Sequence, residues 1–489
     1  MNLLALILVI LAGGAIAAAS SRISDDTPRW VSLGTLVLTG LWLLKVGLAD
    51  PVDDLYAATN YPWIEAFGIN VQLEMDGLSL MLVALTIFLG IVAVVSSWSE
   101  IKSRHGFFQF NLMWTLAGVV GVFTAMDLFL FFVFWEVMLI PMYFLIAIWG
   151  HEERAYAAMK FFLFTQISGL LMLLAILTLV FLNYASSGVI SFDYHVLLTA
   201  DIDSDVSFWL MLGFFIAFVV KLPGVPFHTW LPDAHTQAPT AGSVILAGIL
   251  LKTGAYGLIR FVVPLFPEAA MDFRWPAMML GAISVVYGGY LAYSQTDFKR
   301  LIAYSSVSHM GFVLLGVFAM NQIAAQGAIM QMIAHGFSTA ALFMMAGALQ
   351  ERLHTRDMRK MGGLWMKVPR MGALTLFFIV ASLGMPGLGN FVGEFLVLLG
   401  AFQVDVWITV VAALGIVIAA VYSLMLMQRS FQGTPSQDME ALGEIPDFGA
   451  RELSVMGLMM VALIWLGVNP QPVFDLAAPL VERIVSAGL

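Results

Sequence analysis

Long apolar runs recur along nearly the whole 489-residue chain. A bilayer core of about 30 Å needs about 20 apolar residues per helical crossing. Hydrophobic residues make up 61% of the chain and charged residues only 11%, whereas soluble domains carry roughly 25% charged residues. The sequence therefore predicts an all-α integral membrane protein and excludes soluble enzyme folds. Fourteen crossings are expected, at 4–20, 30–48, 76–97, 108–125, 128–149, 158–183, 206–227, 240–264, 275–294, 299–319, 322–349, 371–399, 405–429 and 452–469.

The positions of lysine and arginine support this count independently. Short cytoplasmic loops carry an excess of positive charge. If the N-terminus lies outside, the inside segments hold sixteen of the 22 basic residues, and the outside segments hold only Arg260, Arg274 and Arg483. A miscounted crossing would scramble that division. Both termini are therefore predicted to lie outside.

Several functional classes lack the residues they need. The chain has no cysteine, so disulfides, thiolate metal sites and cysteine-ligated iron–sulfur clusters are excluded. Neither a G-x-G-x-x-G nor a phosphate-binding P-loop motif is present, and no basic cluster suggests nucleic acid as a partner. His228, Asp233 and His235 could be mistaken for a metal site, but the surrounding prolines favour a re-entrant loop, and no metal or cofactor is expected in this chain.

Four ionisable residues interrupt the apolar crossings: Glu136, Lys221, Lys252 and Glu394. A charged side chain at mid-bilayer costs at least about 2.5 to 3.5 kcal/mol. A purely structural interpretation is that the lysine side chains extend to the membrane interface and that Glu136 pairs with one of them for packing. Lys252 lies about a dozen residues from either end of its crossing, so this interpretation explains it poorly. The four residues are predicted to be functional.

Two histidines extend this polar series. His309 and His335 lie inside the crossings at 299–319 and 322–349. A lone buried histidine is more often a hydrogen-bonded core residue than a proton carrier. A series of lysine, histidine and glutamate across adjacent helices is, however, what a proton path through a membrane requires.

Proline and glycine pairs indicate an internal repeat. KLPGVPFHTW at 221–230 resembles GMPGLGNFVGEF at 384–395, five crossings later. Because five is odd, the two copies would have opposite orientations, as in many transporters. The expected organisation is an N-terminal part at 1–107, a first half at 108–264, an inverted second half at 275–430, and a loop, last helix and tail at 431–489. Kinks or breaks are expected in the long runs 322–349 and 371–399.

These segments resemble the antiporter-like membrane subunits of respiratory complex I, most closely the M type. The similarity covers about residues 60–470 and is carried by long, specific stretches: NLMW, FFVFWEVMLIPMYFLIAIWG, VPFHTWLPDAHTQAPTAGSV, GILLKTGAYGLIRF, QTDFKRLIAYSSVSHMGFVLLG, QMIAHGFSTAALF and MPGLGNFVGEF. The resemblance implies fourteen helices with an inverted five-helix repeat. It also implies residue roles, with Glu136 as partner of Lys221, Lys252 as central relay, Glu394 as terminal proton carrier, and His309 and His335 as links.

The same resemblance implies a subunit of a proton-translocating NADH:quinone oxidoreductase in a bacterial inner membrane. FMN, iron–sulfur clusters and quinone would then belong to partner subunits, among them neighbouring antiporter-like chains. Subunits of sodium/proton antiporters and of membrane-bound hydrogenases share Glu136, Lys221 and the PDAH element, so those classes stay open as alternatives, as does a purely structural scaffold. The LHTRDMRKMGGLW loop and the surroundings of Glu394 favour complex I.

Overall fold

The computed structural model describes residues 2–436, 439 and 442–487. Within these residues, thirteen helices are long and apolar enough to cross a membrane. They are α1 (Leu3–Ser20), α2 (Thr27–Gly47), α3 (Gly77–Ser96), α4 (His105–Thr124), α5 (Leu128–Trp149), α6 (Arg154–Ser187), α8 (Ser204–Lys221), the composite helix Thr240–Leu265, α14 (Arg274–Tyr293), α15 (Phe298–Phe318), α16 (Gln322–Leu353), α20 (Val406–Ser430) and α22 (Ala450–Val468).

The remaining predicted crossing, at 371–399, is broken. It consists of α18 (Pro369–Ser382) and α19 (Gly389–Phe402). Pro386 lacks a backbone donor, and Gly384 and Gly387 have φ values of +82° and +92°, which favour glycine. The expected break is therefore confirmed here. No break occurs in the expected run 322–349, because α16 is one continuous helix of 32 residues without an internal proline.

Short elements join these helices. They are α7 (Tyr194–Leu197), η2 (Phe227–Thr229), α9 (Trp230–Gln237), α13 (Pro267–Asp272), η5 (Met358–Lys360) and α17 (Leu364–Lys367), and a longer helix, α23 (Gln471–Ala487), follows the last crossing. The segment after α8, for which we expected a re-entrant loop, thus forms η2 and α9. α23 occupies the expected C-terminal tail.

Acidic or amide side chains mark where several crossings begin. The side chains of Asp76, Asp127, Asp297, Asn321 and Asp405 each accept a hydrogen bond from a backbone N–H in the first turn of the following helix. Such caps satisfy donors that a helix start leaves open. They fix the helix ends in sequence, and with them the depth of the residues inside each crossing.

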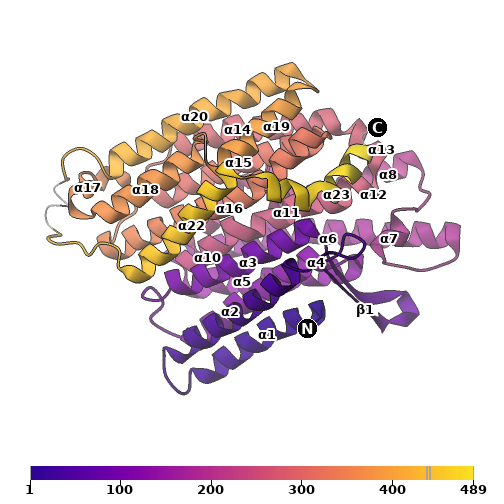
Figure 1. Ribbon diagram of the computed structural model, residues 1–489, viewed down its shortest axis with the longest axis horizontal. Coiled ribbons are helices and arrows are strands. Elements are labelled where there is room, and N and C mark those ends of the chain that lie inside the picture. The colour runs from indigo at the N-terminus through magenta and orange to yellow at the C-terminus, as the bar shows by residue number, and fades with distance from the viewer. Residues whose placement is uncertain (1, 437–438, 440–441, 488–489) are drawn as a thin grey trace.

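The bundle has two distinct ends (Figure 1). Both termini lie at one end, together with β1. We call this the terminal end, and the opposite end, which carries the segments 97–104, 150–153 and 354–363, the loop end. An even number of crossings requires this arrangement.

The terminal end also carries a β-hairpin, which the all-α prediction did not include. Strands β1 (Ala57–Ile64) and β2 (Ile69–Met75) pair antiparallel, with η1 (Glu65–Phe67) between them. Gly68 closes the turn at a φ of +64°. The fold is otherwise the helical membrane bundle that the sequence predicts.

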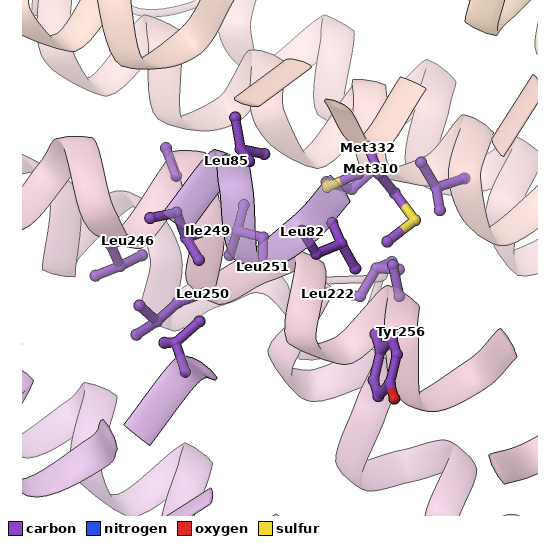
Figure 2. Packing of buried hydrophobic residues seen from close by; sticks show 14 of the residues in the cluster. Leu82, Leu85, Leu222, Leu246, Ile249, Leu250, Leu251, Tyr256, Met310 and Met332 are labelled. Atoms are coloured by element: carbon purple, nitrogen blue, oxygen red, sulfur yellow. The ribbon is translucent and has the colours of Figure 1, made fainter. Parts of the chain in front are cut away.

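The composite helix at the centre of the bundle is irregular. It consists of α10 (Thr240–Ile245), the π-helical turn η3 (Leu246–Leu250), α11 (Leu251–Gly257), a second π-helical turn η4 (Leu258–Val262) and α12 (Val263–Leu265). Every residue from 240 to 263 is buried within the protein. Figure 2 shows leucines of this helix beside Leu82 and Leu85 of α3, with Met310 and Met332 of neighbouring helices close by. Single π-turns inside α-helices often occur at functional sites.

Candidate functional site

Lys252 lies on α11 between the two π-helical turns and has no exposed surface. Its Nζ donates to the carbonyl oxygen of Ala247 at 2.5 Å and lies 2.7 Å from Nδ1 of His335. A lysine ammonium only donates, so His335 Nδ1 acts as the acceptor and its proton belongs on Nε2. The structure thus joins two of the residues predicted from sequence.

The ring of His335 lies next to that of the second histidine, His309. The ring centroids of His335 and His309 are 5.7 Å apart, and both rings are buried. One intervening water or a ring rotation is enough to connect imidazoles at this separation.

His309 is bonded to Glu394. Its Nδ1 lies 2.7 Å from Glu394 Oε1, and Gln331 Nε2 donates to the same oxygen at 2.8 Å. The other ring nitrogen, Nε2, lies 3.1 Å from Ser382 Oγ and 3.2 Å from Tyr422 Oη. Because both hydroxyls can donate to Nε2, the proton of a neutral His309 belongs on Nδ1, facing the carboxylate.

The break between α18 and α19 builds this end of the site. Ser382 is the last residue of α18 and Glu394 lies in the second turn of α19. A Cβ at Gly384 would lie 3.3 Å from Glu394 Oε2. A regular helix through this segment would not bring the backbone against the carboxylate in this way.

The other two predicted residues, Glu136 and Lys221, lie outside this hydrogen-bonded line. Lys221 is fully buried, and its ammonium lies 5.2 Å from the ring centre of Trp135 and 5.4 Å from that of Phe161. Glu136 is half-buried, with its Oε1 close to Gly169. Among the described residues, neither side chain has an ion-pair partner within 4.0 Å. The direct contact that the resemblance implies is therefore not formed in this structure.

The histidines and aspartate of the HTWLPDAH segment do not converge. Asp233 accepts from Lys160 at 2.6 Å and lies 3.6 Å from Arg300. The His235 ring stacks on Phe343 with 4.3 Å between ring centres. No group of three or more potential metal ligands occurs in the part of the chain that the structure describes.

Comparison with known proteins places this arrangement in a family. The family model described as "NADH:quinone oxidoreductase/Mrp antiporter, TM" matches residues 125–419. NADH-quinone oxidoreductase subunit M of Pseudomonas aeruginosa is 55% identical over 488 residues, covering 97% of this chain and 95% of that protein. Subunit M of Escherichia coli strain K12 is 53% identical over 483 residues, covering 96% and 95%. The chain belongs to the subunit M family of NADH-quinone oxidoreductase.

Solved structures agree with this family. A chain of respiratory complex I from Thermus thermophilus, determined with bound NADH, matches with a TM-score of 0.89 and 30% identity over 99% of both chains. A chain of the Mrp complex from a Dietzia species matches with a TM-score of 0.83 at 20% identity, over 98% of this chain and 97% of that one. The latter likeness shows the shared fold.

Three residues of this subunit M family member were missed by the sequence reasoning: Gln331, Ser382 and Tyr422. Gln331 had a usable signal, because it precedes His335 by four residues on α16 and so shares its helix face. Ser382 and Tyr422 had none, since serine and tyrosine are ordinary in apolar helices. All six predicted residues lie in the helices expected, and four of them, Lys252, His335, His309 and Glu394, follow one another in space.

Proposed function

We propose that this chain carries protons across the membrane as subunit M of a proton-translocating NADH:quinone oxidoreductase. The observation that carries the proposal is the buried line from Lys252 through His335 and His309 to Glu394. Its members come from α11, α15, α16 and α19, and each can hold or pass a proton. A structural core would not need four titratable groups in sequence.

The chemistry of the two ends favours transfer along this line. Lys252 is a base that is charged when protonated, and Glu394 is an acid that is charged when deprotonated. Moving one proton from Lys252 to Glu394 converts two buried charges into two neutral groups. The net charge of the line is the same in both states. The neutral state avoids the cost of two buried charges, so charges placed nearby decide which state is favoured.

Glu136 and Lys221 would control this transfer electrostatically. Bringing the carboxylate toward the Lys221 ammonium stabilises that charge, and separating the two releases it. Driving one charge against 100 mV takes about 2.3 kcal/mol. One pKa unit corresponds to about 1.36 kcal/mol, so to work against each 100 mV the pKa of the proton-carrying side chain must change by about 1.7 units. Burial changes lysine pKa values by about 3 to 5 units, which is sufficient.

The energy must come from other subunits. We infer that FMN, iron–sulfur clusters and quinone belong to partner subunits, and that neighbouring antiporter-like chains of the membrane arm contact this one. The chain lies in a bacterial plasma membrane, with the terminal end outside. The concentration of sixteen of 22 basic residues at the other end supports that orientation.

We also infer an inverted repeat of 108–264 and 275–430. The two Pro–Gly segments support it. α8, which ends just before Pro223–Gly224, begins at the terminal end, whereas α18, which ends just before Pro386–Gly387, begins at the loop end. The remaining parts, 1–107 and 431–489, would then be additions to the repeat. A cation/proton antiporter subunit is the second candidate, since the Mrp chain has the same fold.

The test is proton translocation by the complex carrying Lys252→Ala. NADH oxidation with an artificial acceptor reports assembly, and Lys45→Ala, which removes an exposed lysine at the end of α2, is the matched control. We expect NADH oxidation to survive in both variants and pumping to fail only in Lys252→Ala. Normal pumping stoichiometry in Lys252→Ala would overturn the relay. Sodium-dependent transport without an electron donor would favour the antiporter.

A further inference from the structure

Arg260 lies on the same composite helix as Lys252, eight residues closer to the terminal end. Lys252 and Tyr256 lie four residues apart on one face of α11, and Arg260 follows four residues later in the π-helical turn η4, where it contacts the Tyr256 ring. Eight residues of helix span about 12 Å. Arg260 is buried, and its guanidinium carbon lies 5.3 Å from the ring centre of Tyr256. A permanently charged group therefore stands a short distance beyond the central lysine.

A cavity of about 140 Å³, lined by both charged and apolar residues, lies at Arg260 at the terminal end. Its lining includes Asp76, Arg260, Glu74, His195 and Arg483. The elements that meet there are β2, α7 and α23. Arg260 lines this cavity, and Tyr256 lies between Arg260 and Lys252 on the composite helix.

Tyr256 alone would be a weak barrier to protons. Its ring is fully buried, and its hydroxyl oxygen has no hydrogen-bond partner among the described residues. Figure 2 shows the tyrosine hydroxyl pointing away from the leucines of η3 and α11. A free hydroxyl at this place could pass a proton, so the short route needs another obstacle.

Arg260 supplies that obstacle through its fixed orientation. Its guanidinium donates to Asp76, which caps α3 by accepting from Ser79 N–H at 2.9 Å. The Arg260 side chain is 3% exposed and that of Asp76 17%, so the positive partner is the deeper of the two. Arginine does not deprotonate in proteins, and arginines in pores exclude protons and cations in this way.

We propose that Arg260 is an electrostatic seal that blocks direct proton escape from Lys252 into the cavity at the terminal end. The seal forces protons to take the longer route through His335, His309 and Glu394. The proposal rests on the proposed function, because it assumes that Lys252 carries protons. Arg260 is a positioning residue, since it directs the path without itself exchanging a proton.

The test measures passive proton leak through the complex in liposomes, with no NADH present. A potassium gradient with valinomycin drives the protons, and an enclosed pH dye reports their entry. Asp76→Asn retains the arginine and can still cap α3. Asp76→Asn/Arg260→Met removes both charges together, which avoids leaving one buried charge alone. Arg274→Met removes another partly buried arginine at the terminal end, which donates to Ala319 O, and is the matched control.

We expect leak no higher than the wild-type rate in Asp76→Asn, which leaves the Arg260 charge uncompensated, and leak near the wild-type rate in Arg274→Met. In Asp76→Asn/Arg260→Met we expect a leak above the wild-type rate and about tenfold that of Asp76→Asn. These two variants differ by one unit charge, and one unit charge at about 12 Å changes the occupancy of a proton by about tenfold at an effective dielectric constant of about 20. Adding Lys252→Ala should return the leak to the wild-type rate. If the double variant fails to assemble, Asp76→Asn/Arg260→Gln, which keeps a polar side chain, takes its place with the same expectation.

Two results separate the seal from the proposed function. An unchanged leak in an assembled variant without Arg260, while Lys252→Ala still abolishes pumping, overturns the seal alone. Normal pumping in Lys252→Ala overturns the proposed function, and the seal falls with it. A leak that persists after Lys252→Ala also contradicts the seal, because the protons would then bypass the lysine.

Discussion

At the scale of single residues, the two buried lysines, Lys252 and Lys221, have different surroundings. Lys252 has a carbonyl and an imidazole nitrogen as partners, whereas Lys221 lies against two aromatic faces and has no hydrogen-bond partner in the described part of the chain. Cation–π contacts stabilise a desolvated ammonium by about 2 kcal/mol or more, which is less than full burial of the charge costs. Lys221 therefore depends on the half-buried carboxylate of Glu136 to remain charged, although the two groups do not touch here.

This dependence predicts how Glu136 variants behave. Glu136→Gln removes the charge with little change of shape. We expect it to lower proton pumping at least about tenfold, because the loss of one nearby charge changes the pKa of Lys221 by more than one unit. Glu136→Asp keeps the charge with a shorter reach, and we expect it to retain most of the pumping. The readout is protons translocated per NADH oxidised. Equal pumping by Glu136→Gln and the wild type would contradict a role for the charge.

At the scale of elements, α8 and α11 touch at a glycine. A Cβ at Gly254 would lie 2.5 Å from the carbonyl oxygen of Phe218 and 2.7 Å from the backbone N of Leu222. Leu222 follows Lys221, and Gly254 lies two residues after Lys252. The close approach of the two backbones therefore sets the distance between the two lysine-bearing segments.

Gly254→Ala should separate these helices. Overpacking of this kind costs about 1 to 3 kcal/mol, and we expect a lower thermal unfolding temperature of the complex together with reduced pumping. Gly34→Ala is the control, because nothing lies within 4 Å of a Cβ at that position on α2. We expect it to leave both quantities unchanged. An unshifted unfolding temperature for Gly254→Ala would show that the helices can separate freely.

How much of this structure the sequence predicts also depends on scale. The crossings were predictable because length and apolar content are local properties, and the break at Pro386–Gly387 was predictable because proline and glycine act locally. The hairpin was missed because β1, with the sequence AATNYPWI, lacks an alternating apolar pattern and is stabilised by pairing with β2. The π-helical turns were missed because nothing in LAGIL or LIRFV distinguishes them from α-helix.

In the site, too, locally recognisable features were predictable and contacts between distant segments were not. Glu136, Lys221, Lys252 and Glu394 were recognisable because a charge inside an apolar run is expensive. Ser382 and Tyr422 were not recognisable, because a hydroxyl in a membrane helix can bond to its own backbone at little cost. Only the packing of α18 and α20 against α15 shows that both reach His309. Nor does sequence alone show that Glu136 and Lys221 are apart in this state.

At the scale of the whole molecule, the terminal end holds a titratable clamp between β2 and α7. His195 Nε2 lies 3.0 Å from both carboxylate oxygens of Glu74. The hydrogen bond that His195 donates to the Glu74 carboxylate raises the pKa of His195, against a smaller opposing effect of burial. Burial alone would raise the pKa of Glu74, but the hydrogen bond and charge of His195 lower it overall.

The clamp should loosen as the pH rises. The contribution of His195 is fully present below its ordinary pKa of about 6.5 and is lost as the pH rises through the higher folded value. That of Glu74 is present above about 4.5 and is lost only as the pH falls through its lowered value. We expect slower hydrogen exchange in β2 at about pH 6 than at about pH 8.5, after correction for intrinsic rates. His195→Gln should abolish the difference, and a difference that persists would place its origin elsewhere.

The complete burial of residues 240–263 has a consequence for biogenesis. During synthesis this segment enters the bilayer bearing Lys252 and Arg260, each of which costs about 2.5 to 3.5 kcal/mol when it faces lipid. Asp76 is already available to Arg260, but His335 is separated from Lys252 by 83 residues that follow it in the chain. The nascent helix must therefore wait at the translocon, or beside α3 and α8, until α16 arrives. Membrane insertion of this chain is thus expected to be a cooperative event that depends on its later helices.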